Sequence, residues 1–278
     1  MSCCKDDTQP NLSLHYQEAE TIRAYVDARK CFTQMDSYMS LVSHQIVAVL
    51  GLESSRKVRL IDLGGGTGTM SELLSNAVSK QRGQVVCVDR FEAMLAVAKQ
   101  RVGVETLLID AVHFSSLPNQ SYSHVLLKEM VHLVPTNNME ALFSGLHRQL
   151  EPGGKMLIVT RPVEVFLPFP ERVREIWRTT QPPLEFFCEA IKRGTGLDPV
   201  VSFVDCRVSV TKTQWLAFLR SRTWSEFSIL TENEMEEGIQ EVSEKYFDGN
   251  NTTEGGEGES ISIVDRLVFI LTEKKDAS

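Results

Sequence analysis

The sequence has little that would place it in a membrane or send it out of the cell. No hydrophobic run approaches the roughly 20 apolar residues that a helix needs to cross a bilayer. The first residues, Met-Ser-Cys-Cys-Lys-Asp-Asp, are polar and lack the apolar stretch of a secretory signal. We therefore expect a cytoplasmic protein that does not use a membrane.

The sequence also lacks a metal-binding pattern of cysteines and an excess of positive charge. The six cysteines among 278 residues are scattered without metal-ligand spacing, so no bound metal is expected. Lysine and arginine total 29 against 37 aspartates and glutamates, which gives a formal net charge of −8. Proteins that bind nucleic acids usually carry a basic patch or stripe, and none is apparent here. A nucleic-acid partner is therefore not expected, and no pattern predicts the oligomeric state.

The most informative segment that is present predicts a strand, a glycine loop and a helix. Residues 58–68 read Val-Arg-Leu-Ile-Asp-Leu-Gly-Gly-Gly-Thr-Gly, and good helix formers follow over 70–78. Glycines let backbone N–H groups approach a ligand closely at a helix N-terminus. Asp62 ends the first strand and Asp89 ends the next one. An acid about 20 residues beyond such a loop is the usual holder of ribose hydroxyls, so a ligand that contains a nucleoside is predicted.

The spacing of the glycines narrows the class of ligand. The dinucleotide fingerprint G-x-G-x-x-G fails because its third glycine would fall on Thr69. The pattern present is G-x-G-x-G, at Gly64, Gly66 and Gly68, with an acid two residues before it. This pattern closely resembles motif I of the class I S-adenosylmethionine-dependent methyltransferases.

Further segments follow in the order typical of that family. Strands are predicted over 104–111 and 122–129, and Glu-Pro-Gly-Gly-Lys at 151–155 leads into a fifth strand that ends at Thr160. The resemblance is strong over 58–160 and weaker over 200–272. It implies an α/β fold with a doubly wound, seven-stranded, mostly parallel sheet of order 3-2-1-4-5-7-6, strand seven antiparallel. Helical insertions after strands five and six would roof the substrate pocket.

The remaining residues predict additions to a single α/β domain. Helices over 12–28 and 35–50 would form an N-terminal lid region, residues 1–54, before a methyltransferase domain of residues 55–278. Inserted helices are expected at about 165–198 and 211–247. Individual helices are predicted over 171–180, 184–193, from 211 and over 231–246, and late strands over 202–210 and 261–271.

The resemblance implies S-adenosylmethionine as the cofactor and assigns residues to it. Asp89 would accept both ribose hydroxyls, Asp62 would lie near the methionine ammonium, and Asp110 would face the adenine amino group. The alternative for Asp89 is a solvated acid at the end of a strand, which could also cap the next helix. The other cofactor-binding residues expected are Gly64, Gly65, Gly66, Gly68, Arg90, Ala111 and Lys128.

The residues that would bind the methyl acceptor are less clearly indicated by the sequence. Amino-group methyltransferases of nucleic acids and proteins often carry Asn/Asp-Pro-Pro-Tyr/Phe after strand four, and this chain does not. Glu129 and His132 lie where family members place residues between cofactor and substrate. The reference pKa of histidine lies near neutrality, so His132 could act as a general base, or it could simply pack or hydrogen-bond at a helix start.

Three further residues are candidates for the substrate side. Arg161, just past strand five, could bind an anionic group of the substrate, or it could be an ordinary surface residue. Tyr16 and Tyr25 on the first predicted helix could close over the cofactor.

The sequence therefore predicts an S-adenosylmethionine-dependent methyltransferase that acts on a small molecule. A nicotinamide-dependent oxidoreductase is the alternative enzyme, opposed by Thr69 and by the lack of a Tyr-x-x-x-Lys pair in this region. A methyltransferase fold that serves only as an idle partner subunit is the third possibility. The acceptor and the atom that is methylated are not predicted.

Overall fold

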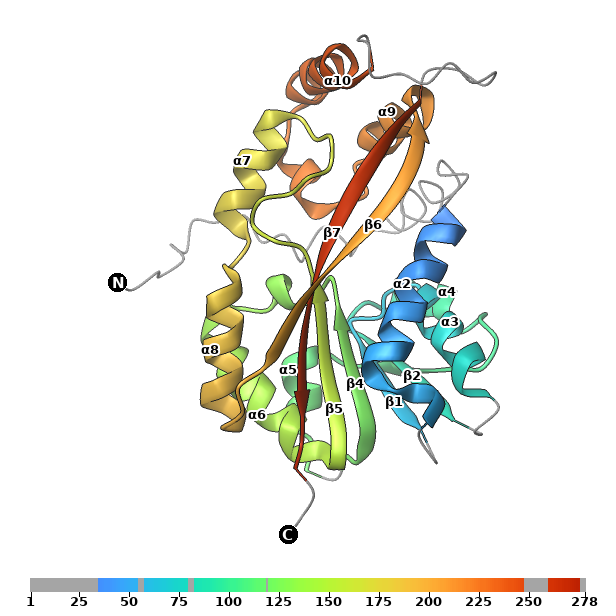
Figure 1. Ribbon diagram of the computed structural model, residues 1–278, viewed down its shortest axis with the longest axis vertical. Helices are drawn as coiled ribbons and strands as arrows, with labels where there is room; N and C mark the ends of the chain where they lie inside the picture. Colours follow the sequence, from blue (N-terminus) through green and yellow to red (C-terminus); the bar gives the residue numbers. More distant parts are fainter. Residues whose placement is uncertain (1–34, 55–57, 80–82, 119, 248–259, 276–278) are drawn as a thin grey trace. The chain divides into compact units, whose positions relative to one another are not determined.

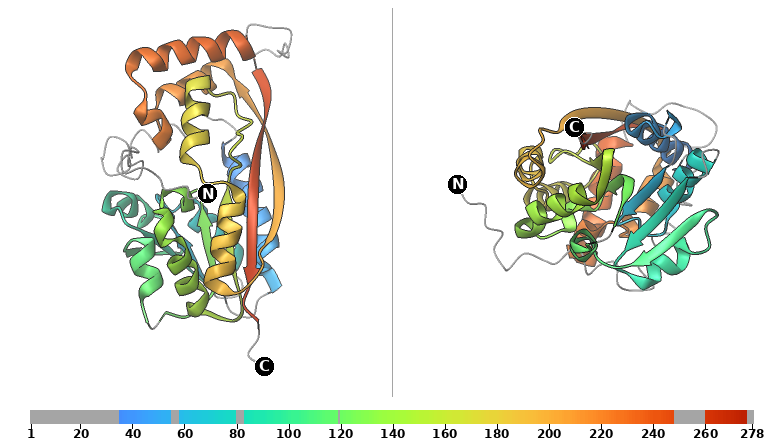
Figure 2. Two further views of the ribbon diagram at one scale, coloured as in Figure 1. Left: turned by 90° about the vertical axis from the view of Figure 1, so that its left-hand side faces the viewer. Right: turned by 90° about the horizontal axis from the view of Figure 1, so that it is seen from below.

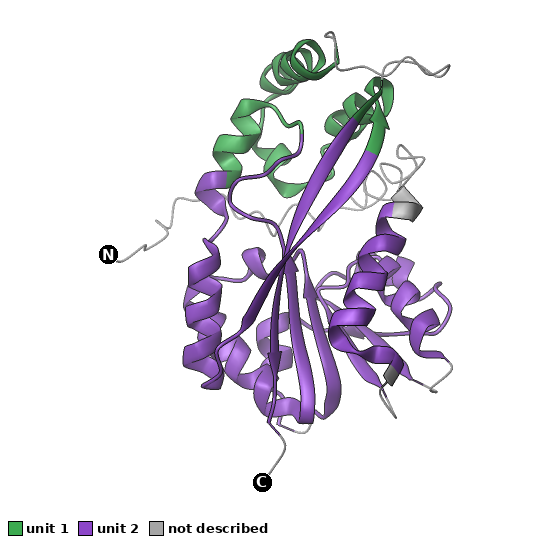
Figure 3. Cartoon of the chain, in the orientation of Figure 1, with its two compact units in different colours: residues 1–33, 168–177, 209–261 green, residues 34–167, 178–208, 262–278 purple. Residues whose placement is uncertain are grey.

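The protein is described here by a computed structural model (Figure 1). The described residues are 35–54, 58–79, 83–118, 120–247 and 260–275. The chain divides into two compact units, coloured separately in Figure 3. Unit 1 comprises residues 1–33, 168–177 and 209–261. Unit 2 comprises residues 34–167, 178–208 and 262–278.

A seven-stranded sheet is the main feature of the fold. Its order is β3-β2-β1-β4-β5-β7-β6, and β7 pairs with β5 in antiparallel fashion, while β1 to β5 pair in parallel. The strands are β1 (Arg59–Leu63), β2 (Gln84–Asp89), β3 (Val104–Leu108), β4 (Tyr122–Lys128), β5 (Leu150–Thr160), β6 (Val200–Thr211) and β7 (Ser260–Glu273). This is the sheet order predicted from the sequence, and the prediction is confirmed.

Helices of unit 2 cover both faces of this sheet (Figure 2). The α-helices are α2 (Met35–Leu50), α3 (Thr69–Val78), α4 (Glu92–Ala98), α5 (Ala111–Ser116), α6 (Met139–Gln149) and α8 (Leu184–Thr195). Short 3-10 helices are η2 (Leu52–Ser54), η4 (Val131–Leu133) and η5 (Thr136–Asn138). Among the described residues, no helix is long and apolar enough to cross a membrane.

Strand alternation explains the two layers. Successive side chains of a strand point to opposite faces, so a strand covered on both faces is apolar throughout. Leu126 of β4 joins the core formed with α2 and α3, whereas its neighbours Val125 and Leu127 join the core formed with α5, α6 and α8. The sheet therefore has a buried layer on each side and leaves its strand ends for polar residues.

Unit 1 has a core of its own, made of aromatic side chains. The Phe169 ring stacks on Trp215 at 5.9 Å and meets Trp224 edge-on at 5.1 Å, and Phe227 adds a second edge contact at 5.4 Å. Trp215 donates its Nε1–H to the Pro168 carbonyl at 2.7 Å. The elements are α7 (Glu171–Thr180, whose last three residues belong to unit 2), α9 (Lys212–Arg220), η6 (Ser225–Ile229) and α10 (Glu232–Tyr246). These aromatic residues therefore serve mainly as packing.

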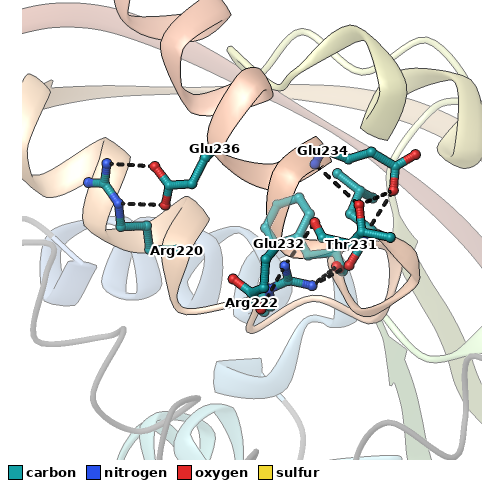
Figure 4. Close-up of polar contacts among 8 residues, drawn as sticks. Arg220, Arg222, Thr231, Glu232, Glu234 and Glu236 are labelled. Atoms are coloured by element: carbon teal, nitrogen blue, oxygen red, sulfur yellow. Dashed lines mark hydrogen bonds and ion pairs between the residues drawn. The ribbon is translucent and has the colours of Figure 1, made fainter.

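Polar contacts fix the connection between α9 and α10 (Figure 4). Arg222 donates to the carbonyls of Leu230, at 2.5 Å, and Thr231, at 3.1 Å. The Thr231 hydroxyl accepts from the Glu234 amide, and the Glu234 carboxylate accepts from the Thr231 amide, which completes a capping box. Two backbone N–H groups at the start of α10 are thus satisfied within the unit.

Most predicted elements agree with the structure to within a few residues, and two ends differ. The fifth strand begins at Leu150, so the Glu-Pro-Gly-Gly-Lys segment at 151–155 lies within β5 instead of leading into it. The third strand ends at Leu108 instead of running to Ala111, because Asp110 caps the N-terminus of α5. The helix predicted over 12–28 lies outside the described residues. The division at residue 54 stays a prediction; in the structure α2 belongs to unit 2 together with the sheet.

Candidate functional site

The candidate site lies where the parallel strands of unit 2 end. The register aligns Asp62 of β1 with Cys87 of β2 and with Leu126 of β4. Asp89 and Lys128 are the last residues of β2 and β4. Because carboxyl ends of neighbouring parallel strands share one edge, these polar side chains come together where open α/β sheets bind ligands.

The glycine loop has the conformation that its sequence predicts. Gly64, Gly66 and Gly68 have φ values of +75°, +57° and +70°, the left-handed region that favours glycine. A Cβ at Gly64 would lie 2.8 Å from the Met130 Cβ. A Cβ at Gly66 would meet only the Met94 Sδ, at 3.9 Å, among the described residues outside its chain neighbours. Within the described part of the chain, the middle of the loop therefore has room for a ligand.

Arg101 fixes this loop through three hydrogen bonds and was not predicted from the sequence. Its Nε donates to the Thr67 carbonyl at 2.5 Å, and its other nitrogens donate to Glu72 at 2.6 Å and Thr69 at 2.7 Å. The arginine is 34 residues from Thr67 and belongs to no motif. No local signal in the sequence could have revealed it.

Asp62 is a buried carboxylate beside the loop, 1% exposed. Its Oδ2 accepts the Ser71 hydroxyl at 2.5 Å, and a Cβ at Gly65 would lie 2.9 Å from that same oxygen. Burial raises the pKa of Asp62 to about 6, although the Ser71 hydrogen bond and the charge of Lys128 act in the opposite direction. A cation bound here would stabilise the ionised form of Asp62. The methionine ammonium, which is expected near Asp62 from the sequence, would be such a cation.

Asp89 is held by backbone amides on both of its oxygens. Oδ1 accepts the Phe91 N–H and Oδ2 accepts the Gly66 N–H, each at 2.9 Å. Burial raises the pKa of Asp89, and these backbone hydrogen bonds oppose the rise. Since each carboxylate oxygen has two lone pairs, both retain acceptor capacity for hydroxyl groups. The carboxylate is thus held by the backbone. It is not solvated, whereas the alternative interpretation required a solvated carboxylate.

Asp110 acts locally as a helix cap. Its Oδ1 accepts the amides of Val112 and His113, each at 3.0 Å, and its Oδ2 pairs with the His113 ring. Burial opposes ionisation, but the contacts with His113 outweigh it and lower the pKa of Asp110. An adenine contact by Asp110 stays a prediction and would share a carboxylate already bound to α5. Ala111 is the first residue of α5, and the exposed Arg90 guanidinium lies 5.1 Å from the Phe91 ring.

Lys128 is a half-buried amine among charged groups. Burial and the nearby Arg161 lower the pKa of Lys128 to about 8, while Asp265 and Asp62 act to raise it. Its position at the end of β4, beside β1, is compatible with a role next to the cofactor, which stays a prediction.

Arg161 lies between two carboxylates and is 6% exposed, so the alternative of a surface residue is wrong. Its Nε and one terminal nitrogen, NH2, donate to Asp265 at 2.9 and 2.7 Å, and the other terminal nitrogen, NH1, pairs with Glu129. Burial opposes ionisation of Asp265, but Arg161 and the Tyr38 hydroxyl lower its pKa. Two carboxylates already balance the Arg161 charge, so the geometry does not favour an anion site here.

The remaining candidates are placed only in part. His132 lies half-buried on η4, shortly after β4, and its role as a general base stays a prediction. Tyr16 and Tyr25 lie outside the described residues. Asp265 and Tyr38 were not predicted; the one signal was that Asp265, next to Arg266, interrupts a largely apolar final strand.

Comparison with protein families supports this geometry. Residues 60–154 match the family model described as a methyltransferase domain. A curated relative, the ubiquinone/menaquinone biosynthesis C-methyltransferase UbiE of Legionella pneumophila, is 27% identical over 158 residues. That match covers 54% of this chain and 62% of the relative. The chain thus spans less than two thirds of this curated relative.

Comparison with solved structures supports the fold. A putative methyltransferase from an antibiotic biosynthesis pathway of Anabaena variabilis superposes with a TM-score of 0.58 at 17% identity, covering 82% of this chain and 95% of that one. Phosphoethanolamine N-methyltransferase 2 of Haemonchus contortus, in complex with S-adenosyl-L-methionine, superposes with a TM-score of 0.55 at 18% identity. That match covers 97% of this chain and 61% of the other. With the domain match and the sheet order, these similarities confirm the resemblance predicted from the sequence.

Proposed function

We propose that this chain, a class I methyltransferase by its domain match and its sheet order, transfers a methyl group from S-adenosylmethionine to a small-molecule acceptor. The observation that carries the proposal is the pair of carboxylates, Asp62 and Asp89, beside a glycine loop whose middle glycine, Gly66, is not covered by the other described residues. A carboxylate for an ammonium and a second for a ribose are the groups that this cofactor requires.

The described residues fit the cofactor as follows. Asp89, already oriented by the amides of Gly66 and Phe91, would accept the two ribose hydroxyls. Asp62 would balance the ammonium of the methionine part, and the open face of Gly66 would lie against that part. The adenine amino group would reach Asp110. When bound, S-adenosylmethionine supplies a methyl group activated by a sulfonium.

On the acceptor side, the chain would orient a nucleophile and manage its proton. His132 would take the proton that the acceptor atom loses as its lone pair forms the new bond to carbon. Glu129 would hold the acceptor in line, since alignment of reactants can remove about 7–11 kcal/mol from a barrier. No metal is needed for this chemistry.

The identities of the relatives support a small acceptor. One is named as a quinone C-methyltransferase and one as a phosphoethanolamine N-methyltransferase, so the proposal leaves the methylated atom open. A cytoplasmic location is part of the proposal. It is supported by Cys87, Cys188 and Cys206, which are free thiols and suit a reducing compartment.

Calorimetry and a labelling assay test the proposal. S-adenosylmethionine and its demethylated product should bind, and NADH should not. Incubation with methyl-tritiated S-adenosylmethionine and a small-molecule extract should transfer label to a low-mass compound. Comparable NADH binding would support the oxidoreductase alternative, which the antiparallel β7 between β5 and β6 already disfavours. Cofactor binding without transfer to any extract would support an idle partner subunit.

A further inference from the structure

Residues from four segments of unit 2 meet in one largely buried polar cluster, and two of them directly follow the carboxyl ends of β4 and β5. Tyr38 comes from α2, Glu129 follows β4, Arg161 follows β5 and Asp265 comes from β7. The Tyr38 hydroxyl donates to Asp265 Oδ2 at 2.7 Å and accepts from Arg161 at 3.2 Å. We call these four residues the Arg161 cluster.

The geometry of Arg161 is directional. Asp265 accepts from its Nε and NH2 in a bidentate pair, which fixes the plane of the guanidinium. The remaining nitrogen, NH1, is the one that pairs with Oε2 of Glu129. Asp265 therefore orients the Arg161 guanidinium so that NH1 faces Glu129. The Tyr38 hydroxyl supports this orientation by donating a hydrogen bond to Asp265.

Glu129 has an unusual backbone conformation within this cluster. Its φ of +53° is uncommon for a residue that is not glycine, and such conformations persist only when the surroundings enforce them. Its amide donates to the Val159 carbonyl at 2.8 Å, which prolongs the pairing of β4 with β5. The backbone and one carboxylate oxygen of Glu129 are thus both fixed.

The second oxygen of Glu129 has no such contact. Oε1 is buried and accepts no hydrogen bond from any of the described residues. A buried carboxylate oxygen without a donor is unfavourable, and a ligand that supplies one removes the penalty. The residue directly follows Lys128, at the strand end where the acceptor is proposed to lie.

We propose that Arg161, Asp265 and Tyr38 are positioning residues that fix Glu129 so that its Oε1 accepts a hydrogen bond from the methyl acceptor. The acceptor therefore carries an N–H or O–H group at or beside the atom that is methylated. This inference rests on the proposed methyl transfer. It reassigns Arg161 from an anion site to a support for Glu129.

A double-mutant cycle separates positioning from general stability. The probe is methyl-tritiated S-adenosylmethionine with the small-molecule fraction that the wild type labels. In Glu129→Gln the side-chain amide oxygen will face Arg161. The amide NH2 group, a hydrogen-bond donor, then takes the place of Oε1, which accepts hydrogen bonds. Asp265→Asn alone should lower turnover at least tenfold and leave the Kd for S-adenosylmethionine within threefold. In the Glu129→Gln background the same Asp265→Asn change should lower turnover less than twofold.

Two matched pairs control for loss of packing. Tyr38→Phe should lower turnover several-fold, whereas Tyr122→Phe should not, although the buried Tyr122 hydroxyl also donates to a side-chain oxygen, that of Gln149, at 2.9 Å. Arg161→Lys should lower turnover about as much as Asp265→Asn. Arg266→Lys, which breaks the bidentate pair with Asp205 on the exposed part of the sheet, should leave turnover unchanged.

The outcomes are distinguishable. If the Asp265→Asn and Glu129→Gln losses multiply, or if Tyr122→Phe lowers turnover as much as Tyr38→Phe, the cluster is merely structural and the inference is wrong. If mass spectrometry identifies the labelled product, and the acceptor from which it formed has no N–H or O–H group at or beside the methylated atom, the substrate class is wrong. A wild type that binds no S-adenosylmethionine or labels nothing refutes the proposed function itself, and the inference with it.

Discussion

Replacement of Asp62 by asparagine should stabilise the protein while it weakens the cofactor site. The carboxylate is 1% exposed, and its burial raises its pKa from 3.8 to about 6. A shift of about 2 units corresponds to about 3 kcal/mol at 1.36 kcal/mol per unit. Above pH 6 the folded protein bears that penalty in full, because Asp62 is ionised in both the folded and the unfolded chain.

The sign of the pH dependence follows from the same shift. Between pH 6 and about 4 the folded state binds a proton at Asp62 that the unfolded chain does not, so the wild type gains stability as the pH falls. The asparagine variant has no such group and can still accept the Ser71 hydroxyl. The advantage of Asp62→Asn should therefore be largest near neutral pH and vanish near pH 4.

The assay is urea or thermal unfolding without cofactor at several pH values, with calorimetry of S-adenosylmethionine binding in parallel. At about pH 7.5 the variant should be more stable by roughly 1–3 kcal/mol, which raises Tm by several degrees. Its cofactor Kd should rise at least tenfold, since the ammonium loses its carboxylate.

A control tests whether any loss of negative charge would have the same effect. Asp205 is an exposed carboxylate whose pKa the Arg266 hydrogen bond lowers, so its contribution to stability has the opposite sign. Asp205→Asn should not stabilise the protein at neutral pH. A less stable Asp62→Asn variant at pH 7.5, or a difference that does not change with pH, would refute the reasoning.

Three further predictions concern single residues. Asp89→Ala removes charge-assisted hydrogen bonds worth about 1.5–3 kcal/mol each, so calorimetry should show at least tenfold weaker cofactor binding; an unchanged Kd would place the ribose elsewhere. His132→Gln should lower turnover by about 10²-fold or more and remove the acidic limb of the pH–rate profile, with cofactor Kd within a few-fold; full turnover with a lower Tm would make His132 structural. Arg101→Met should cost about 1–3 kcal/mol in unfolding experiments and loosen the glycine loop, so that cofactor affinity falls as well; a loop that binds equally well would show that Arg101 only supports α3.

The sequence by itself determined those features whose physical cause is local. The glycine loop is local because positive φ at Gly64, Gly66 and Gly68 is a property of single residues. The capping boxes at Thr211 and Thr231 are local because a cap and its partner are three residues apart. The motifs placed Asp89 at the end of a parallel strand, and the fold class then implied that Asp89 lies next to the glycine loop.

The tertiary structure decided everything that joins distant segments. Tyr38 and Asp265 are separated by 227 residues, and Arg161 and Asp265 by 104, yet they form one buried cluster. No periodicity links such residues, because the partner of a buried charge is chosen by strand order and side-chain reach rather than by spacing along the chain. The sequence could therefore name Arg161 and Glu129 as candidates, but only the folded sheet shows that they pair with each other.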